Sequence, residues 1–441
     1  MYNTAVGAAA GQAVTTGRLN TLIGGLTGDA LTVGERNTAV GAVALGADTQ
    51  GSRSVAVGNS ALATQNFTSA TDAYNTAVGY DAGKSVTTGT NNTLIGGLAG
   101  DAITTGHSNV ATGYNALGAN TTGAALSALG KDALASNTTG ASNTAVGKAA
   151  LFSNTEGLTN TAVGKDALYA NTTASNNTAV GFQSLYANTT GTNNVAIGKD
   201  ALDSNTTGSN NTALGVDTLQ ANTTASDSTA LGHGALAVST GASNTAVGKY
   251  ALVANTTGEE NVAVGSNALD SNTTGGDNVA VGMHALGSNT TSSDNTAVGR
   301  SALANNTAAN NTAVGRSALA LNTTGTENVA TGKGALQLNT TGTRNTALGM
   351  GALVFNTTAS SNTAVGRNAL NANTTGAFNT AVGSAALDNN TTANNNVAVG
   401  YAALDDNTTG SSNVAIGTLT LDANTTGANN TAVGTSALGA N

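Results

Sequence analysis

The sequence predicts an all-β protein, a parallel β-solenoid in which about 26 coils of 17 residues follow one another. Three observations lead to this prediction. A glycine that closes the motif Asn-Thr-Ala-Val-Gly recurs, in most steps every 17 residues, from Gly7 to Gly434. The 441 residues include no proline, which would remove a donor from a hydrogen-bonded ladder. A two-helix repeat needs about 33 residues or more, so this period is too short for a helical solenoid.

The repeat motif at the start of each coil is predicted to form a short strand. Side chains alternate between the two faces of a strand. In the motif at 194–198, Val195 and Ile197 therefore share one face and Ala196 takes the other. We predict that the aliphatic position before the glycine faces the core. The alanines are then predicted to form an outward stripe that is flat enough for close packing between chains, at Ala162, Ala179 and Ala196.

The Ala-Leu pair that follows the glycine is predicted to lie in a second short strand, with its leucine as the second apolar anchor of the coil. Each coil then consists of two strands and two turns. The predicted core of the coils from 160 to 220 comprises Val163, Leu168, Val180, Leu185, Val195, Ile197, Leu202, Leu214 and Leu219.

The Asn-Thr-Thr-Gly segment is predicted to turn the corner of each coil, because asparagine and glycine tolerate positive φ. In-register stacking of identical coils places asparagine on asparagine and builds hydrogen-bonded ladders. The predicted turn and ladder residues are Gly164, Asn171, Gly181, Asn188, Gly198 and Asn205.

The whole chain, 1–441, reads as a single continuous repeat domain, because no shift in composition marks a linker. One step, from Gly58 to Gly79, contains a four-residue insertion. Residues 10–24 also match residues 82–96 closely, at an offset of 72. A block duplication within the N-terminal third is the simplest explanation.

The predicted core is thin. Each coil supplies two or three medium aliphatic side chains, and burying each contributes about 1.5–3 kcal/mol. Ordering the backbone costs about 1–2 kcal/mol for each of the residues in a coil. Ladder hydrogen bonds help, but we expect lateral association of chains, preferably a homotrimer.

Composition excludes several functions. The net charge of −9 argues against a nucleic-acid-binding surface. Cysteine is absent, which removes disulfides and thiolate sites. No apolar stretch approaches the roughly 20 residues of a membrane-spanning helix, so we expect no membrane insertion by this segment. No signal-peptide pattern is visible at the N-terminus, so we expect a protein outside the general secretory route, a mature form or a fragment.

The sequence offers no catalytic constellation. Its three histidines, His107, His233 and His284, occupy repeat positions that hold other residue types elsewhere. Catalysis or metal binding needs several converging side chains. We therefore predict no enzymatic activity, no cofactor and no metal site.

Two minor binding alternatives remain open. Asp166, Asp200 and Asp217 share one repeat position and would form part of a carboxylate row. A calcium ladder of the RTX kind, however, would carry a Gly-Gly-x-Gly-x-Asp repeat, which is absent. Stacked threonines also suggest ice binding, but the adjacent Thr172 and Thr173 would face opposite sides if extended.

The segments NNVAIG at 193–198 and SNVAIG at 412–417 resemble the head repeats of YadA-type trimeric autotransporter adhesins. The longer pattern N-T-A-V-G-x-x-A-L-x-x-N-T-T-G is similar to repeat arrays of bacteriophage tail-fibre proteins. The 17-residue spacing and the Asn-Thr-Thr corner depart from the adhesin pattern. The resemblance implies a left-handed, trimeric β-roll that attaches to host surfaces and has no enzymatic activity.

The expected function is therefore a structural or adhesive fibre, serving as shaft or head of a tail fibre or of a bacterial surface adhesin, in an extracellular setting. The alternative is a subunit of an extracellular filament that stacks end to end. The expected partners are other copies of the chain and a host-surface glycan or receptor. Aromatic side chains are expected as isolated surface contacts, at Tyr80, Tyr169, Phe182, Tyr186 and Tyr401.

Overall fold

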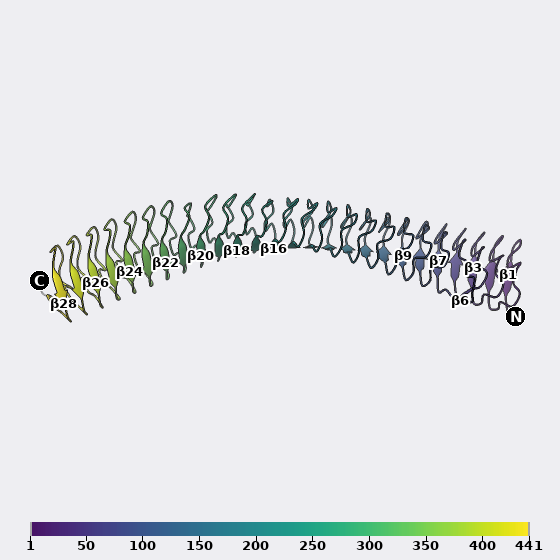
Figure 1. The fold of residues 1–441 in the computed structure, drawn as a ribbon, viewed down its shortest axis with the longest axis horizontal. Coiled ribbons are helices and arrows are strands. Elements are labelled where there is room, and N and C mark those ends of the chain that lie inside the picture. The colour runs from purple at the N-terminus through teal and green to yellow at the C-terminus, as the bar shows by residue number, and fades with distance from the viewer. Residues whose placement is uncertain (1, 440–441) are drawn as a thin grey trace. The chain divides into compact units, whose positions relative to one another are not determined.

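The structure, a computed structural model, describes residues 2–439 and confirms the parallel β-solenoid. The chain divides into two compact units, Met1–Ser226 (unit 1) and Asp227–Asn441 (unit 2), whereas the repeat pattern gives no sign of a boundary. In each unit, successive coils stack and each adds one short strand to a parallel sheet (Figure 1). The described residues contain no helix of the length and apolarity that a membrane span requires.

The main sheet of unit 1 is parallel and in register, so equivalent residues of successive coils lie side by side. Thr161 pairs with Thr178, and Ala162 pairs with Ala179. Its strands are β1 (Thr4–Val6), β2 (Thr21–Ile23), β3 (Thr38–Val40), β5 (Val55–Val57), β7 (Thr76–Val78), β8 (Thr93–Ile95), β9 (Val110–Thr112), β10 (Ser127–Leu129), β11 (Thr144–Val146), β12 (Thr161–Val163), β13 (Thr178–Val180), β14 (Val195–Ile197) and β15 (Thr212–Leu214).

Unit 2 repeats this arrangement and keeps its register where a coil is one residue short, as in the pairing of Thr229 with Thr245. Its strands are β16 (Thr229–Leu231), β17 (Thr245–Val247), β18 (Val262–Val264), β19 (Val279–Val281), β20 (Thr296–Val298), β21 (Thr312–Val314), β22 (Val329–Thr331), β23 (Thr346–Leu348), β24 (Thr363–Val365), β25 (Thr380–Val382), β26 (Val397–Val399), β27 (Val414–Ile416) and β28 (Thr431–Val433).

The Ala-Leu segment is a series of turns and not the predicted second strand. Asp166 and Leu168 have φ of 58° and 51°, in the left-handed region. The amide of Ala167 donates to Gly164 in its own coil, while the amide of Leu168 donates to Ser184 in the next coil. Because every second residue is left-handed, the chain curls around the core. Ala167 and Leu168 are therefore both buried, although neighbours in a strand would face opposite sides.

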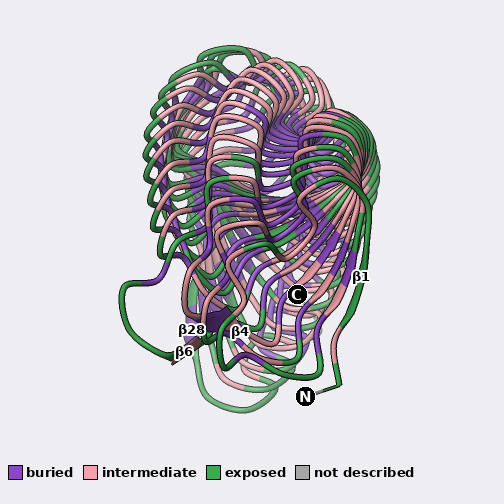
Figure 2. Ribbon diagram, turned by 90° about the vertical axis from the view of Figure 1, so that its right-hand side faces the viewer, coloured by how far each residue is buried: buried purple, intermediate pink, exposed green. Residues whose placement is uncertain are grey.

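The core is formed by the alanine at the centre of each strand and by the Ala-Leu pair, as the buried interior in Figure 2 indicates. The predicted anchors Leu168, Leu185, Leu202 and Leu219 are fully buried. The predicted inward face of the strand was wrong. The alanines Ala162, Ala179 and Ala196 are fully buried. The predicted core residues on the other face lie toward solvent. Val163, Val180 and Val195 are half-buried, and Ile197 and Leu214 are 37% and 40% exposed.

The strand centre must be small because the leucine from the turn segment fills the interior. Two coils show the reverse arrangement. At Leu22 and Leu94 the strand centre is a leucine, and the positions that hold the turn leucine elsewhere are glycines. A Cβ at Gly28 would lie 2.9 Å from Leu22 Cδ2, and a Cβ at Gly100 would lie 2.9 Å from Leu94 Cδ2. The interior of a coil can therefore be filled by one leucine that comes either from the strand centre or from the turn segment.

This exchange predicts a strong coupling between Leu94 and Gly100. Leu94→Ala alone should leave a cavity and lower the free energy of unfolding by about 2–5 kcal/mol. Gly100→Leu alone should overpack the layer and cost about 1–3 kcal/mol. In the double variant the new leucine occupies the vacated space, so the combined loss should be smaller than the sum by about 1 kcal/mol or more. Denaturant unfolding of the four proteins measures the coupling, and additive losses would contradict the exchange.

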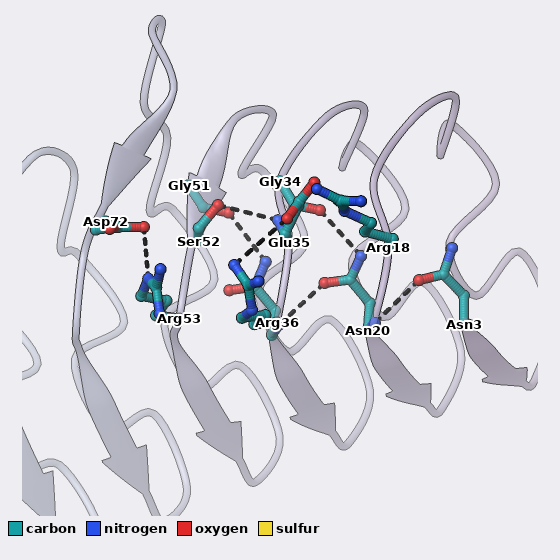
Figure 3. Close-up of polar contacts among 11 residues, drawn as sticks. Asn3, Arg18, Asn20, Gly34, Glu35, Arg36, Gly51, Ser52, Arg53 and Asp72 are labelled. Carbon is teal, nitrogen blue, oxygen red and sulfur yellow. Dashed lines mark hydrogen bonds and ion pairs between the residues drawn. The ribbon is translucent and has the colours of Figure 1, made fainter. Parts of the chain in front are cut away.

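Two rows of buried asparagines connect the coils. In the strand-start row, which precedes the strands, the amide of Asn177 donates to Asn160 Oδ1 (2.9 Å) and Asn177 Nδ2 donates to the carbonyl of Gly191 (2.9 Å). Figure 3 shows the same relay from Asn3 to Asn20, with Asn20 Nδ2 directed at Gly34.

The corner row contains the first asparagine of each Asn-Thr-Thr segment. Asn188 Nδ2 donates to Asn171 Oδ1 (3.1 Å) and to the carbonyl of Gly191 (3.0 Å). Asn205 Nδ2 donates in turn to Asn188 Oδ1 (2.8 Å). The carbonyl of Gly191 thus accepts one hydrogen bond from each row, which uses both of its lone pairs. The other predicted turn residues, Gly164, Gly181 and Gly198, have φ of 139–140°.

The four-residue insertion lies between β5 and β7 and adds a small second sheet of β4 (Gly51–Ser52) and β6 (Thr71–Asp72). Here Asp48 and Gln65 replace the corner asparagines. Gln65 Nε2 donates to Asp48 Oδ2 (2.7 Å), and both side chains are fully buried. The longer coil is thus accommodated by a local polar network.

Candidate interaction surface

The strand face, defined as the first and third residues of each strand in the main sheets, is the most uniform surface of both units. In β13, Thr178 and Val180 flank the buried Ala179. Throughout the described strands of the main sheets, the first position holds Thr, Val or Ser, and the third holds Val, Ile, Leu or Thr. The third-position side chains reach 67% exposure at Val433 in β28 and 51% at Leu129 in β10. The strand face therefore carries no charged side chain in any described strand.

In-register pairing places these aliphatic side chains in rows, with neighbouring strands about 4.8 Å apart. Extended apolar patches on soluble proteins mark sites of interaction. The alanine stripe of Ala162, Ala179 and Ala196 is buried and cannot contact another chain. The strand face replaces it as the surface through which coils can pack laterally.

The post-glycine row, which consists of the residue after each closing glycine, carries lysines in unit 1. Lys165 Nζ lies 5.2 Å from the ring centroid of Phe182 and 3.4 Å from Asp166 Oδ2. Lys199 Nζ lies 2.6 Å from Asp200 Oδ2. Asp166 and Asp200, from the predicted carboxylate row, are thus paired with lysines. The hydrogen bond and the charge of Asp200 raise the pKa of Lys199, and the charge of Asp217 raises it further. Residues 2–439 contain no group of three potential metal ligands.

Three aromatic rings of unit 1 stack on one another, although the sequence suggested isolated contacts. The centroids of Phe152 and Tyr169 are 5.1 Å apart, and those of Tyr169 and Tyr186 are 5.2 Å apart. Their spacing of 17 residues in the sequence is the signal that could have revealed the stack. Tyr169 therefore stacks on both of the other rings. Tyr80, Phe182 and Tyr401 are exposed and occupy the post-glycine row.

The three histidines do not converge. His107 Nδ1 lies 3.3 Å from Ser108 Oγ. His233 packs edge to face against Tyr250, with centroids 5.2 Å apart. His284 lines a shallow hollow of polar residues that includes Asp270. Their separate surroundings offer no shared chemistry.

The corner threonines differ in their surroundings. Thr172 is half-buried and its hydroxyl donates to the carbonyl of Thr189 in the next coil (3.3 Å). Thr173 is exposed. In this pair, only Thr172 forms a hydrogen bond to the neighbouring coil through its hydroxyl.

Acidic side chains recur in the last coils of unit 2 at one repeat position, at Asp388, Asp405 and Asp422. The Oδ1 atoms of Asp405 and Asp422 are buried and accept no hydrogen bond from the described residues. Burial, followed by repulsion from Asp388, Asp406 and Asp422, raises the pKa of Asp405 to about 6. Burial also raises the pKa of Asp388.

The raised pKa predicts that unit 2 is less stable at neutral than at acidic pH. Between the ordinary value of 3.8 and about 6, the folded Asp405 holds a proton that the unfolded chain releases. Stability therefore falls as pH rises through this window. Asp405→Asn should raise the melting temperature by roughly 1–3 °C at pH 7.5 and leave it unchanged at pH 3. Asp277→Asn, an exposed control with the same charge change, should show no such pH dependence, and equal gains for both variants would contradict the prediction.

No protein-family model matches this chain, and no curated protein matches it either.

Proposed function

We propose that this chain is a non-enzymatic structural and adhesive protein that forms the shaft or head of an extracellular fibre, on a virion tail or on a cell surface. The observation that supports this most strongly is the strand face. Every coil of this solenoid offers nearly the same surface, and a repeated surface suits multivalent attachment.

The proposed assembly is a homotrimer that packs through the strand faces of its three chains. The face is free of charge and built from small β-branched and aliphatic residues, such as Thr178, Val180 and Val195. Packing two such surfaces requires no desolvation of ionised groups, which would be costly. It would also bury the aliphatic rows that a single chain leaves exposed.

The mass of the intact chain in solution tests this proposal. Sedimentation equilibrium should give three times the chain mass of 42.4 kDa. The combined variant Val163→Glu, Val180→Glu and Ile197→Glu places three charges on the strand face and should shift the mass toward that of one chain. Circular dichroism should remain unchanged, because these side chains point away from the core.

A matched control carries the same three charges at the corner, as Thr173→Glu, Thr190→Glu and Thr207→Glu. These threonines are exposed, and the native chain already has Glu156 at this position. The control should keep the wild-type mass. A wild-type mass near 42.4 kDa would refute self-association, and a trimer that tolerates the strand-face charges would refute this interface.

A further inference from the structure

Basic residues of unit 2 gather in one part of the post-glycine row, at Arg300, Arg316, Lys333 and Arg367 (the basic ridge). We propose that the basic ridge, with the hollow beside it, binds a linear polysaccharide that carries one carboxylate or sulfate per sugar unit. This inference rests on the adhesive part of the proposed function and names its ligand class.

Charge is strongly segregated along unit 2. Residues 295–387 contain five basic side chains and a single acid, Glu327, which pairs with Arg344 (3.1 Å). Residues 251–294 and 388–439 contain acidic side chains and no lysine or arginine. In a protein with a net charge of −9, this segment is a local positive surface. It can attract an anionic ligand that the rest of the chain repels.

The cations of the basic ridge are exposed, and within residues 2–439 none of them forms an ion pair. The residues that follow them are Ser301, Ser317, Gly334 and Asn368, all uncharged. In the same row of unit 1, Lys131, Lys165 and Lys199 each have an aspartate partner in the next residue, and among the described residues only Lys148 lacks one. The basic ridge therefore keeps its charge available for a ligand.

A hollow of about 280 Å³ opens beside the middle of the basic ridge. Its lining includes two glycines, Gly334 and Gly351, at a position where the neighbouring coils carry Ser317 and Asn368. A Cβ at Gly334 would lie 3.3 Å from Gln337 Oε1, whereas the space beside Gly351 is taken by the Asn368 amide, whose Oδ1 would lie 2.6 Å from a Cβ. The side chains around the hollow come from Arg316, Ser317, Lys333, Gln337, Met350 and Val354.

This lining matches the parts of an acidic sugar. Arg316 and Lys333 can bind its carboxylate or sulfate through charge-assisted hydrogen bonds. The amide of Gln337 can both donate to and accept from sugar hydroxyls, while Met350 offers an apolar wall to the ring. Cations that recur once per coil, about 4.8 Å apart, can follow a chain whose acidic groups recur once per sugar.

A nucleic acid fits this surface less well. No aromatic side chain lines the hollow, so bases would find no stacking platform, which single-strand binders use. Duplex DNA also carries one charge per about 1.7 Å, far denser than the single row of cations.

Binding of the full chain to defined polymers tests the proposal by titration calorimetry, with polygalacturonate as the carboxylated probe and dextran sulfate as the sulfated probe. We expect binding to at least one of them and none to neutral dextran. The variant Arg300→Gln, Arg316→Gln and Lys333→Gln should lose about ten-fold or more in affinity. The control Lys131→Gln, Lys165→Gln and Lys199→Gln, in unit 1, should stay within about two-fold of wild type.

The hollow has its own variant. Gly334→Ser keeps every charge and uses a residue that Ser317 shows to be tolerated at this position, where a Cβ would lie 3.3 Å from Gln337 Oε1. Affinity should fall about five-fold if the sugar enters the hollow. Unchanged affinity would overturn the role of the hollow. Absence of binding to both anionic polymers, equal loss in the unit 1 control, or tighter binding of single-stranded DNA would overturn the proposal as a whole. These results do not depend on the sedimentation mass, which tests the fibre assembly separately.

Discussion

Gly96→Ala is expected to break the stack between two coils, whereas Gly97→Ala, one residue later, is expected to have almost no effect. Gly96 has φ of 136°, which side-chain-bearing residues rarely adopt. A Cβ there would lie 2.5 Å from the carbonyl oxygen of Gly113 and 2.7 Å from its carbon. These are backbone atoms of the next coil, so no side-chain movement can relieve the overlap. At Gly97 the only neighbour of a Cβ within 4 Å is Tyr114 Cδ2, at 3.7 Å.

The expected loss for Gly96→Ala is about 3 kcal/mol or more in the free energy of unfolding, since backbone strain costs about 1–3 kcal/mol and overpacking a similar amount. Gly97→Ala should stay within about 0.5 kcal/mol of wild type. Denaturant unfolding measures both, and hydrogen exchange should show faster opening of the amides around Gly113 in the first variant. Equal stability of the two proteins would show that the coils do not approach each other at Gly96 as described.

Asn177→Ala carries the second large effect, because it removes one member of the strand-start row. Asn177 Oδ1 accepts the amide of Asn194 (2.9 Å) and Asn177 Nδ2 donates to the carbonyl of Gly191 (2.9 Å). The truncation leaves the buried amide of Asn194 without its acceptor and removes one of the two bonds to Gly191. The expected loss is about 2–4 kcal/mol, most of it from the unsatisfied amide.

Asn176→Ala is the matched control, because this neighbour is exposed and lies outside both asparagine rows. Its φ of 62° resembles that of Ala125, which occupies the same repeat position at 56°. The control should therefore cost about 1 kcal/mol or less. If Asn176→Ala were as destabilising as Asn177→Ala, the strand-start row would not be what holds neighbouring coils together.

The period of the coil and the stacking of like residues could be predicted from sequence, because both follow directly from the 17-residue repeat. The alternation of residues could not show which face of the strand points toward the core. A pattern such as Val195-Ala196-Ile197 fits two orientations equally well, and side-chain size favoured the wrong one. The deciding signal was present elsewhere. Leu22 and Leu94 replace the strand alanine only where the turn leucine is replaced by glycine, which shows that both positions share one interior layer.

The turns of the Ala-Leu segment could not be predicted for a different reason. Leu168 and its equivalents adopt left-handed φ near 50°, which costs roughly 1 kcal/mol or more and is avoided by leucine in local propensities. Only burial of the leucine and hydrogen bonds to the neighbouring coil favour this conformation, and both are tertiary effects. At the candidate surfaces, the basic ridge follows from the charges in the sequence. The hollow needed coordinates, because it depends on how Gly334, Gly351 and Gln337 lie together.

The in-register coil is tested most directly by a disulfide, because the chain has no native cysteine. Thr161 and Thr178 are direct partners in neighbouring parallel strands and share an outward face. Thr161→Cys with Thr178→Cys should therefore oxidise to a bond within one chain, since disulfides form at Cα separations of about 4.4–6.8 Å. Thr161→Cys with Ala179→Cys should not, because the second cysteine faces the core. Peptide mapping of mixed light and heavy chains identifies bonds within a chain. Formation of the first bond alone is the predicted result, and failure of the first pair or ready oxidation of the second would contradict the register.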